Sequence, residues 1–269
     1  MKAWTRPNRR PAPNLSVPSA RYCNLVVAQT AGLRLAAADR AVLLHGRYLQ
    51  MDVIGQGTFG KIVACRDLLW PNHRMVAVKM IEAKYDYIGR QERFVLSNLD
   101  IQYICKLRDA FLHKGRFCLV FDLLGPPLLH SLAFAAQNLH RIRKIAVQLI
   151  GALLHLQDRR IIHADIKPDN ILLVSNDQSA TSSKIQLIDF GNSLRSNETN
   201  AYWDDFDLQS LYYRAPEIVF SFHEFGFPID MCRQRARFAG LLGRLSRSYP
   251  RQVVSDIGQV ETVHSAAGA

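Results

Sequence analysis

Short runs of apolar and β-branched residues follow one another between residues 48 and 121, separated by glycine or Pro-Asn turn signals. Runs of this length, bounded by turn residues, predict antiparallel β-strands. Between the third and the fourth run, the stretch Gln91–Leu99 has helical character. The pattern therefore predicts an antiparallel sheet with one helix, and the expected strands are Tyr48–Ile54, Lys61–Arg66, Met75–Ile81, Tyr103–Phe111 and Arg116–Phe121.

From Leu139 onward the apolar positions recur at steps of three and four residues, which predicts a long helix with one apolar face. That face consists of Ile142, Ile145, Ala146, Leu149, Leu153 and Leu156. Further on, Leu172–Val174 and Ile185–Ile188 predict a small hairpin, and we expect its polar connection, residues 175–183, to be mobile. A strand-rich first part and a mainly helical second part indicate the α+β fold class.

Both ends of the chain differ in composition from this middle part. The protein has 269 residues, 48% of them hydrophobic, and a formal net charge of +11. The first 47 residues hold eight Lys or Arg and one Asp, and residues 231–269 hold six Arg and two acidic residues, whereas residues 48–230 hold twenty of each sign. The excess positive charge therefore belongs to the tails. Because the arginines of the C-terminal tail belong to no recognised nucleic-acid-binding module, we do not expect them to bind nucleic acid.

Residues 1–47 are expected to form an extension that is largely disordered, because the first twenty residues hold four prolines and few groups that could form a core. The basic cluster Arg6–Arg10 is interpreted either as a nuclear-import patch or as a solubilising tail. Five scattered cysteines without a C-x-x-C pair favour a reducing compartment, the cytoplasm, the nucleus or both. No apolar run approaches the roughly 18 to 20 residues that cross a bilayer, so no membrane contact is expected.

A glycine-rich motif, Gly55-Gln56-Gly57-Thr58-Phe59-Gly60, follows the first expected strand. The same G-x-G-x-x-G pattern occurs in dinucleotide-binding loops, which run from a strand into a helix. Here Lys61–Cys65 is β-branched and strand-like, which favours a glycine hairpin that folds over phosphates. Without a Cβ, the backbone N–H groups of such a hairpin can approach phosphate oxygens closely.

The strand Met75–Ile81 contains the sequence Val76-Ala77-Val78-Lys79. Strand alternation places Ala77 and Lys79 on one face, where the small residue leaves room for an adenine ring and the ammonium group reaches phosphates. Glu92 in the following helix is the expected partner of this lysine, and Glu82 is the weaker candidate because it alternates to the other face. The alternative is a lysine and a glutamate that are simply solvated at the surface.

A further motif is His163-Ala164-Asp165-Ile166-Lys167-Pro168-Asp169-Asn170. It places a carboxylate, a lysine and an asparagine at a spacing that suits a base, a charge clamp and a metal ligand on one phosphoryl group. Taken alone, it could equally be a polar surface turn. Two further motifs favour the catalytic interpretation: Asp189-Phe190-Gly191 follows Asn170 by nineteen residues, and Ala215-Pro216-Glu217 comes later in the chain.

These six features occur in order at compatible spacing, and over residues 48–231 the chain resembles the eukaryotic protein kinases. The resemblance implies a bilobal fold, with an antiparallel N-lobe over residues 48–122 and a helical but incomplete C-lobe over residues 123–231. The catalytic-loop motif and the segment Leu208–Ile218 are most similar to the DYRK, HIPK and pre-mRNA-processing kinase branch of the CMGC group.

The resemblance also implies roles for single residues, with ATP and Mg²⁺ as cofactors and proteins as substrates. Lys79 would hold the α- and β-phosphates with Glu92 behind it, Asp165 would orient the substrate hydroxyl and accept its proton, and Lys167 would steady the γ-phosphate. Asn170 and Asp189 would bind Mg²⁺. Because a lysine follows two residues after Asp165, the acceptor should be Ser or Thr. The residues expected to contact the nucleotide are Ile54, Gly55, Gln56, Gly57, Gly60, Ile62, Ala77, Lys79, Asp122, Leu124 and Leu172.

The resemblance further assigns the gatekeeper position to Phe121 and a packing role to His163, near Phe190 and Leu96. Three positions depart from the family pattern. Ala164 replaces the arginine that gathers an activation-loop phosphate, and Leu211 replaces an arginine that shapes a proline-accepting pocket. Asp207 stands at the site of an autophosphorylated tyrosine, where its charge could pair with Arg214.

The family pattern stops at Met231, because Cys232 stands where a tryptophan is expected. Residues 232–269 are a basic tail without family resemblance, interpreted as an artefact of a gene model or of splicing, or as a natural truncated isoform. Two functions therefore remain open: a protein serine/threonine kinase, or a catalytically weak module that binds nucleotide or a partner and regulates other kinases. The sequence does not indicate an oligomeric state.

Overall fold

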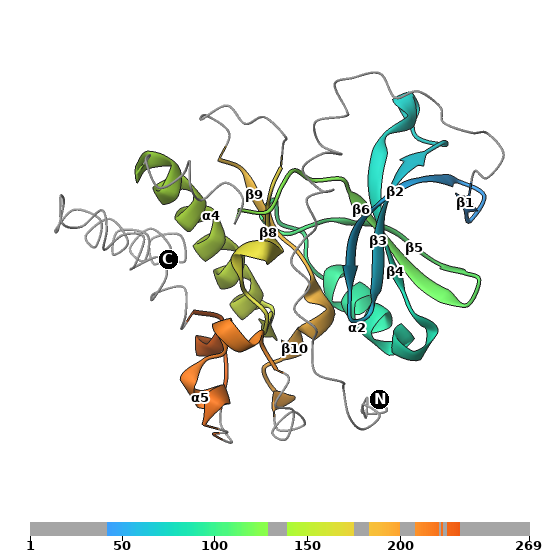
Figure 1. The fold of residues 1–269 in the computed structure, drawn as a ribbon. Coiled ribbons are helices and arrows are strands. Elements are labelled where there is room, and N and C mark those ends of the chain that lie inside the picture. Colours follow the sequence, from blue (N-terminus) through green and yellow to red (C-terminus); the bar gives the residue numbers. More distant parts are fainter. Residues whose placement is uncertain are drawn as a thin grey trace. The chain divides into compact units, whose positions relative to one another are not determined.

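The computed structural model describes residues 42–128, 139–174, 183–199, 208–220, 222 and 225–231. The chain separates into two compact units, Met1–Asp230 and Met231–Ala269, and only Met231 of the second unit is described (Figure 1). The expectations for residues 1–41, the 175–182 connection, Asp207 and the tail 232–269 lie outside the described residues.

A six-stranded antiparallel sheet forms the first part of the larger unit, in the order β1-β2-β3-β4-β6-β5. Its strands are β1 (Leu43–Leu44), β2 (Tyr48–Gly57), β3 (Gly60–Asp67), β4 (Met75–Ile81), β5 (Leu107–His113) and β6 (Arg116–Asp122). Val76, Val78 and Met80 alternate with Ala77 and Lys79 along β4 and join one buried cluster. Ala77 and Lys79 therefore lie on the opposite face of β4, away from this cluster. The sheet begins at Leu43, upstream of the expected boundary at residue 48.

Helix α2 (Asp86–Leu96) begins five residues before the expected Gln91 and ends three before Leu99. The prediction was wrong there because Gly89 lies inside the helix, where glycine costs about 1 kcal/mol relative to alanine. The structure shows why a glycine is there. A Cβ at Gly89 would lie 2.6 Å from atoms of both Ile81 and Phe117, so the helix approaches the sheet as closely as only glycine permits.

Strand β5 begins at Leu107, four residues later than predicted. The preceding residues bind another part of the chain instead. Ile104 forms a bridge with Leu187, and Cys105 N–H donates to the Leu187 carbonyl over 2.9 Å. A run of apolar residues does not show whether residues 103–106 extend β5 or pair with Leu187, because both arrangements bury the same side chains.

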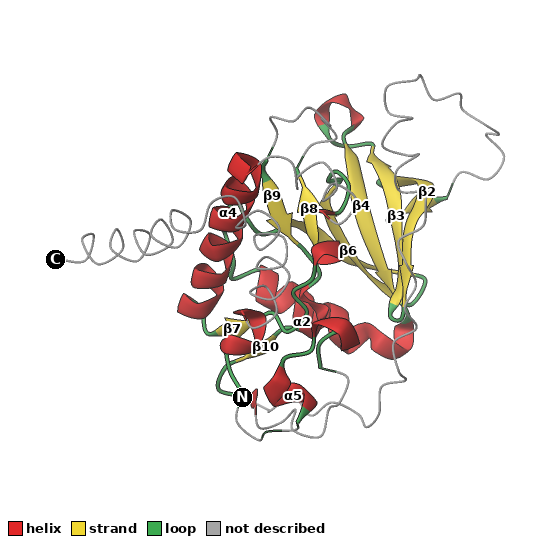
Figure 2. Ribbon diagram, turned by 60° about the vertical axis from the view of Figure 1, so that its left-hand side comes forward, coloured by secondary structure: helices red, strands yellow, loops and turns green. Residues whose placement is uncertain are grey.

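The second part of the unit is built on helix α4 (Leu139–Asp158) (Figure 2). Five of the six residues expected on its apolar face are buried, and Ala146 is half-buried. Two small antiparallel sheets pair β7 (Ile161–Ile162) with β10 (Leu194–Arg195) and β8 (Ile171–Leu173) with β9 (Ile185–Leu187). Helix α5 (Pro216–Val219) follows later in the chain. The short 3₁₀ helices of the described ranges are Pro71–His73, Ala83–Tyr85, Pro168–Asn170, Phe190–Asn192 and Leu211–Tyr213.

The expected α+β fold, an antiparallel sheet with one helix followed by a part built on a long helix, is thus confirmed. Among the helices in the described ranges, none combines the length and the apolar character needed to span a membrane.

Candidate active site

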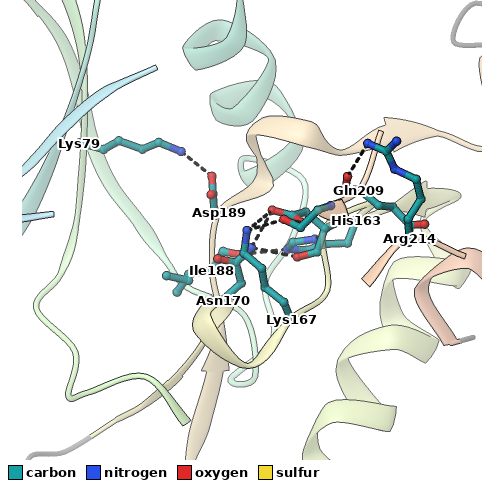
Figure 3. A network of polar contacts seen from close by, with 10 residues as sticks. Lys79, His163, Lys167, Asn170, Ile188, Asp189, Gln209 and Arg214 are labelled. Carbon is teal, nitrogen blue, oxygen red and sulfur yellow. Dashed lines mark hydrogen bonds and ion pairs between the residues drawn. The ribbon is translucent and has the colours of Figure 1, made fainter. Parts of the chain in front are cut away.

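Lys79 lies between two carboxylates that come from different parts of the chain. Its Nζ is 2.7 Å from Oε2 of Glu92 on α2. It is also 2.7 Å from Oδ1 of Asp189, which follows β9 (Figure 3). The ion pair expected between Lys79 and Glu92 is therefore present, and the Glu92 side chain is only 1% exposed. Glu82, the weaker candidate, is 49% exposed and pairs with Lys84 at 3.2 Å.

The three groups shift one another's proton affinity. Burial alone would lower the pKa of Lys79, but Asp189 and Glu92 outweigh it and hold that pKa above its usual range. Burial would raise the pKa of Asp189, but Lys79 outweighs it and lowers that pKa to about 2. For Glu92 burial dominates and raises the pKa, although Lys79 opposes it. Lys79 and Asp189 are thus both charged at neutral pH, and the ammonium group can meet an anionic ligand.

The loop after β7 places two polar side chains, those of Lys167 and Asn170, next to Asp165. Nζ of Lys167 is 2.8 Å from Asp165 Oδ2, and Nδ2 of Asn170 donates to the carbonyl oxygen of Asp165 over 2.9 Å and to its Oδ2 over 3.2 Å. Burial would lower the pKa of Lys167, but Asp165 outweighs it and raises that pKa. The segment therefore presents an oriented carboxylate beside a cation, as the spacing in the sequence predicted.

Ser210 is a member of this cluster to which the sequence assigned no role. Its hydroxyl donates to Oδ1 of Asp165 over 2.7 Å and accepts from Nζ of Lys167 over 2.8 Å, and its backbone N–H points to the same Oδ1 at 3.2 Å. The only available signal was its place in the segment before Ala215-Pro216-Glu217. Because the contact spans more than forty residues, no local pattern could reveal it.

A buried carboxylate at the end of the larger unit forms hydrogen bonds with the backbone of the catalytic loop. Asp230, 5% exposed, accepts the backbone N–H groups of His163 and Ala164 over 2.7 and 2.9 Å. Burial raises the pKa of Asp230. The His163 ring packs edge-on against the Phe190 ring, with the centroids 4.7 Å apart. Its Nε2 lies 3.0 Å from the carbonyl oxygen of Ile188 (Figure 3). The packing role expected for His163 is confirmed for its contact with Phe190.

The glycine motif forms the hairpin turn between β2 and β3, where Gly57 faces Gly60. This confirms the hairpin and not the strand-to-helix loop. At Gly60, φ is +151°, and a Cβ would lie 2.0 Å from the backbone oxygen of Met80. At Gly57 nothing lies within 4 Å of an added Cβ. Residue 60 must therefore be a glycine for the turn to form, whereas the space next to Gly57 is open to a ligand.

The residues expected around an adenine ring come from three strands. Ile62 on β3 and Ala77 on β4 lie on neighbouring strands, and Ala77 faces Phe121 on β6. Leu172 on β8 bridges Pro127, so its strand is tied to the segment that follows β6. Leu124, in that segment, is buried. The carboxylate of Asp122 is engaged elsewhere, with Arg108 at 2.6 Å and Arg74 at 3.0 Å.

The two residues expected to bind Mg²⁺ lie on adjoining segments (Figure 3). Ile188 N–H donates to the Asn170 carbonyl over 2.9 Å, which brings Asp189 next to this residue. Because the Asn170 amide nitrogen donates to Asp165, its carboxamide oxygen remains as a ligand. The described residues contain no group of three or more His, Cys, Asp or Glu side chains that could hold a metal. Since Mg²⁺ commonly takes one or two protein oxygens together with phosphates, this donor set fits it.

A model of the protein kinase domain matches residues 48–232. The chain belongs to the protein kinase family. Among curated relatives, this kinase is 34% identical over 185 residues to the dual specificity protein kinase YAK1 of Saccharomyces cerevisiae and 34% identical over 197 residues to the serine/threonine-protein kinase ppk15 of Schizosaccharomyces pombe. It is 35% identical over 199 residues to homeodomain-interacting protein kinase 1 of Caenorhabditis elegans.

These alignments cover 64%, 69% and 69% of the kinase chain but only 22%, 35% and 22% of the relatives. The chain thus spans about a third or less of the length of these proteins. Their names confirm the resemblance to the DYRK and HIPK branch.

Two of the positions where the kinase departs from the family pattern can be located in the structure. Ala164 is fully buried and has a φ of 61°. Because the residue is an alanine, no basic side chain extends from this position. Leu211 is 59% exposed beside Ser210. The third departure, Asp207, lies outside the described residues, so its pairing with Arg214 stays a prediction. Arg214 donates to the Gln209 carbonyl over 3.2 Å.

Proposed function

We propose that this protein transfers the γ-phosphoryl group of ATP to Ser or Thr hydroxyls of proteins. The observation that carries the proposal is the arrangement around Asp165, whose carboxylate lies 2.8 Å from Lys167 and beside Asn170 and Ser210. A carboxylate held in this way is a base for an alcohol and lies next to a cation for a phosphate. The relatives described as serine/threonine or dual specificity kinases support the same reaction class.

Lys79 would bind the phosphates of the nucleotide. Its raised pKa keeps it cationic, and Glu92 orients the ammonium group from behind at 2.7 Å. When phosphates arrive, Lys79 can exchange its contact with Asp189 for a phosphate oxygen while it retains Glu92. Asp189 is then free for a metal ion.

Asp165 would accept the proton of the acceptor hydroxyl. Lys167 and Ser210 each bond to one of its oxygens, so the carboxylate cannot rotate away from the acceptor. Lys167 also places a positive charge where charge develops on the transferred group, the effect that dominates phosphoryl transfer. A lysine at this position is the feature that favours Ser or Thr as the acceptor.

Asn170 and Asp189 would hold Mg²⁺, which supplies charge neutralisation on the phosphates when it is bound. The chain contributes one carboxamide oxygen and one carboxylate, and the low pKa of Asp189, about 2, keeps this carboxylate ionised.

The experiment that tests the proposal measures transfer of radiolabel from ATP to a generic basic protein by the purified chain, next to the variant Asp165→Ala. We expect incorporation by the wild-type chain and background for the variant. Equal background for both would refute kinase activity in this chain. Nucleotide-dependent thermal stabilisation that is lost in Lys79→Met would report ATP binding independently of transfer.

A second function is favoured by one observation. Near the end of the family match, large apolar side chains are exposed, namely Val219 (55%), Phe220 (69%), Phe222 (60%) and Met231 (43%). Exposed apolar side chains of this kind suit a nucleotide-binding module that regulates other kinases with little transfer of its own. Stabilisation by ATP without any incorporation of label would identify this function.

An intracellular location, in the cytoplasm, the nucleus or both, belongs to the same proposal. Cys65, Cys105 and Cys118 are free thiols in the structure, which accords with a reducing compartment. Localisation of a tagged full chain by microscopy tests it, and recovery from the culture medium would contradict it.

A further inference from the structure

The tip of the glycine turn is attached to the rest of the chain through Phe59. The Phe59 ring meets the Tyr85 ring edge-on, with centroids 5.3 Å apart and an interplanar angle of 81°. The Phe59 carbonyl also accepts the backbone N–H of Glu82 over 2.9 Å. Both contacts fall on the short segment between β4 and α2. The turn is therefore held at Phe59, whereas at Gly57 nothing lies within 4 Å of an added Cβ.

Tyr85 suits an anchor because it is itself fixed. It is 8% exposed and belongs to a buried cluster with Ile81, Ile88, Phe117 and Leu119. The Lys84 ammonium group lies 4.8 Å from its ring centroid. Its backbone stands directly before α2, the helix that carries Glu92. One aromatic contact thus joins the glycine turn to the helix that orients Lys79.

We propose that Tyr85 is a positioning residue for the phosphates of a nucleoside triphosphate. The backbone N–H groups of the turn bind phosphate oxygens well only if they are already in place, because a loose hairpin would have to be ordered on binding. Tyr85 supplies that order through Phe59 and links it to the Lys79–Glu92 pair. The inference rests on the proposed binding of ATP and adds a residue that none of the six kinase motifs contains.

The test compares the affinities of the full chain for ATP and for adenosine, which has the base and ribose without phosphates. The variants are Tyr85→Leu, Tyr85→Phe and Phe59→Leu. An edge-to-face aromatic pair contributes enough to change affinity by roughly threefold to tenfold. We expect Tyr85→Leu and Phe59→Leu to weaken ATP binding by about this factor and to leave adenosine binding unchanged. Tyr85→Phe should retain the affinity of the wild type for ATP.

Tyr87→Leu is the matched control, because Tyr87 packs against the same cluster from α2. It should lower the melting temperature without changing the ratio of ATP to adenosine affinity. If Tyr85→Leu does not fold, Phe59→Leu carries the test, since Phe59 is only partly buried.

Equal weakening of ATP and adenosine binding in both variants would overturn the inference in favour of a purely structural role. Unchanged ATP affinity would overturn it as well, with nucleotide binding intact. Absence of ATP binding in the wild-type chain would instead refute the proposed function, and the inference with it.

Discussion

The hydroxyl of Ser210 lies 2.7 Å from Oδ1 of Asp165 and donates a hydrogen bond to it. The same hydroxyl accepts from Lys167 over 2.8 Å, so one small side chain bridges the proposed base and the proposed phosphate clamp. Because a hydrogen bond to a charged group is stronger than one between neutral groups, this bridge fixes the carboxylate in one orientation.

Replacement of Ser210 should reduce transfer without reducing nucleotide binding. A hydrogen bond to a charged group contributes about 1.5–3 kcal/mol, so Ser210→Ala should lower the rate of phosphoryl transfer by roughly tenfold to a hundredfold. ATP affinity should stay nearly constant, because Ser210 contacts Asp165 and Lys167 of the catalytic loop and not the Lys79 cluster. Ser210→Thr keeps the hydroxyl and serves as the control. A variant Ser210→Ala with full activity would show that the bridge has no role in transfer.

Removal of Lys79 should destabilise the fold as well as weaken ATP binding. Lys79→Met leaves the Glu92 carboxylate, 1% exposed, without its cation. Loss of one partner of a buried pair costs about 3–5 kcal/mol of unfolding free energy. The double variant Lys79→Met/Glu92→Gln, which leaves no buried charge at this position, should recover part of that loss in chemical denaturation. No recovery would mean that the lysine stabilises the chain through its packing and not through its charge.

The two glycines that face each other in the turn should respond differently to alanine. At Gly60 a Cβ would meet the Met80 carbonyl at 2.0 Å and φ is +151°, so Gly60→Ala should cost about 3 kcal/mol or more of unfolding free energy. Gly57→Ala places its methyl group in open space and should change stability by less than about 1 kcal/mol. Thermal unfolding of both variants provides the comparison. Equal destabilisation would contradict the geometry of the turn.

The stability contributed by Asp189 should depend on pH on the acid side. Its pKa in the folded chain is about 2, below the ordinary value of 3.8. A depressed pKa means that the contribution is complete above about pH 4 and is lost as the pH falls toward 2. The melting temperature of Asp189→Asn, measured without nucleotide, should therefore lie below that of the wild type at pH 7.

The difference between these two melting temperatures should shrink as the pH falls from about 4 toward 2. Lys79→Met supplies the control, because Lys79 is the main cause that lowers this pKa. On that background Asp189→Asn should show little pH dependence. A difference that stays constant with pH would contradict the lowered pKa.

The sequence by itself determined the family, the α+β class and the identity of most residues at the site. The Lys79–Glu92 pair, the glycine hairpin and the buried face of α4 all follow from local spacing, because a strand alternates every two residues and a helix repeats every three or four. The motif around Asp165 is equally local, since its members lie within eight residues of one another.

Only the tertiary structure decided the rest. The start of α2 depends on how closely Gly89 approaches Ile81 and Phe117, and the start of β5 depends on the pairing of Ile104 and Cys105 with Leu187. Ser210 and Asp230 reach the catalytic loop from forty-five and sixty-seven residues away. Such contacts depend on the packing of the whole unit. The partner of a polar side chain cannot be identified from the sequence when the two residues are distant in the chain and only the fold brings them together.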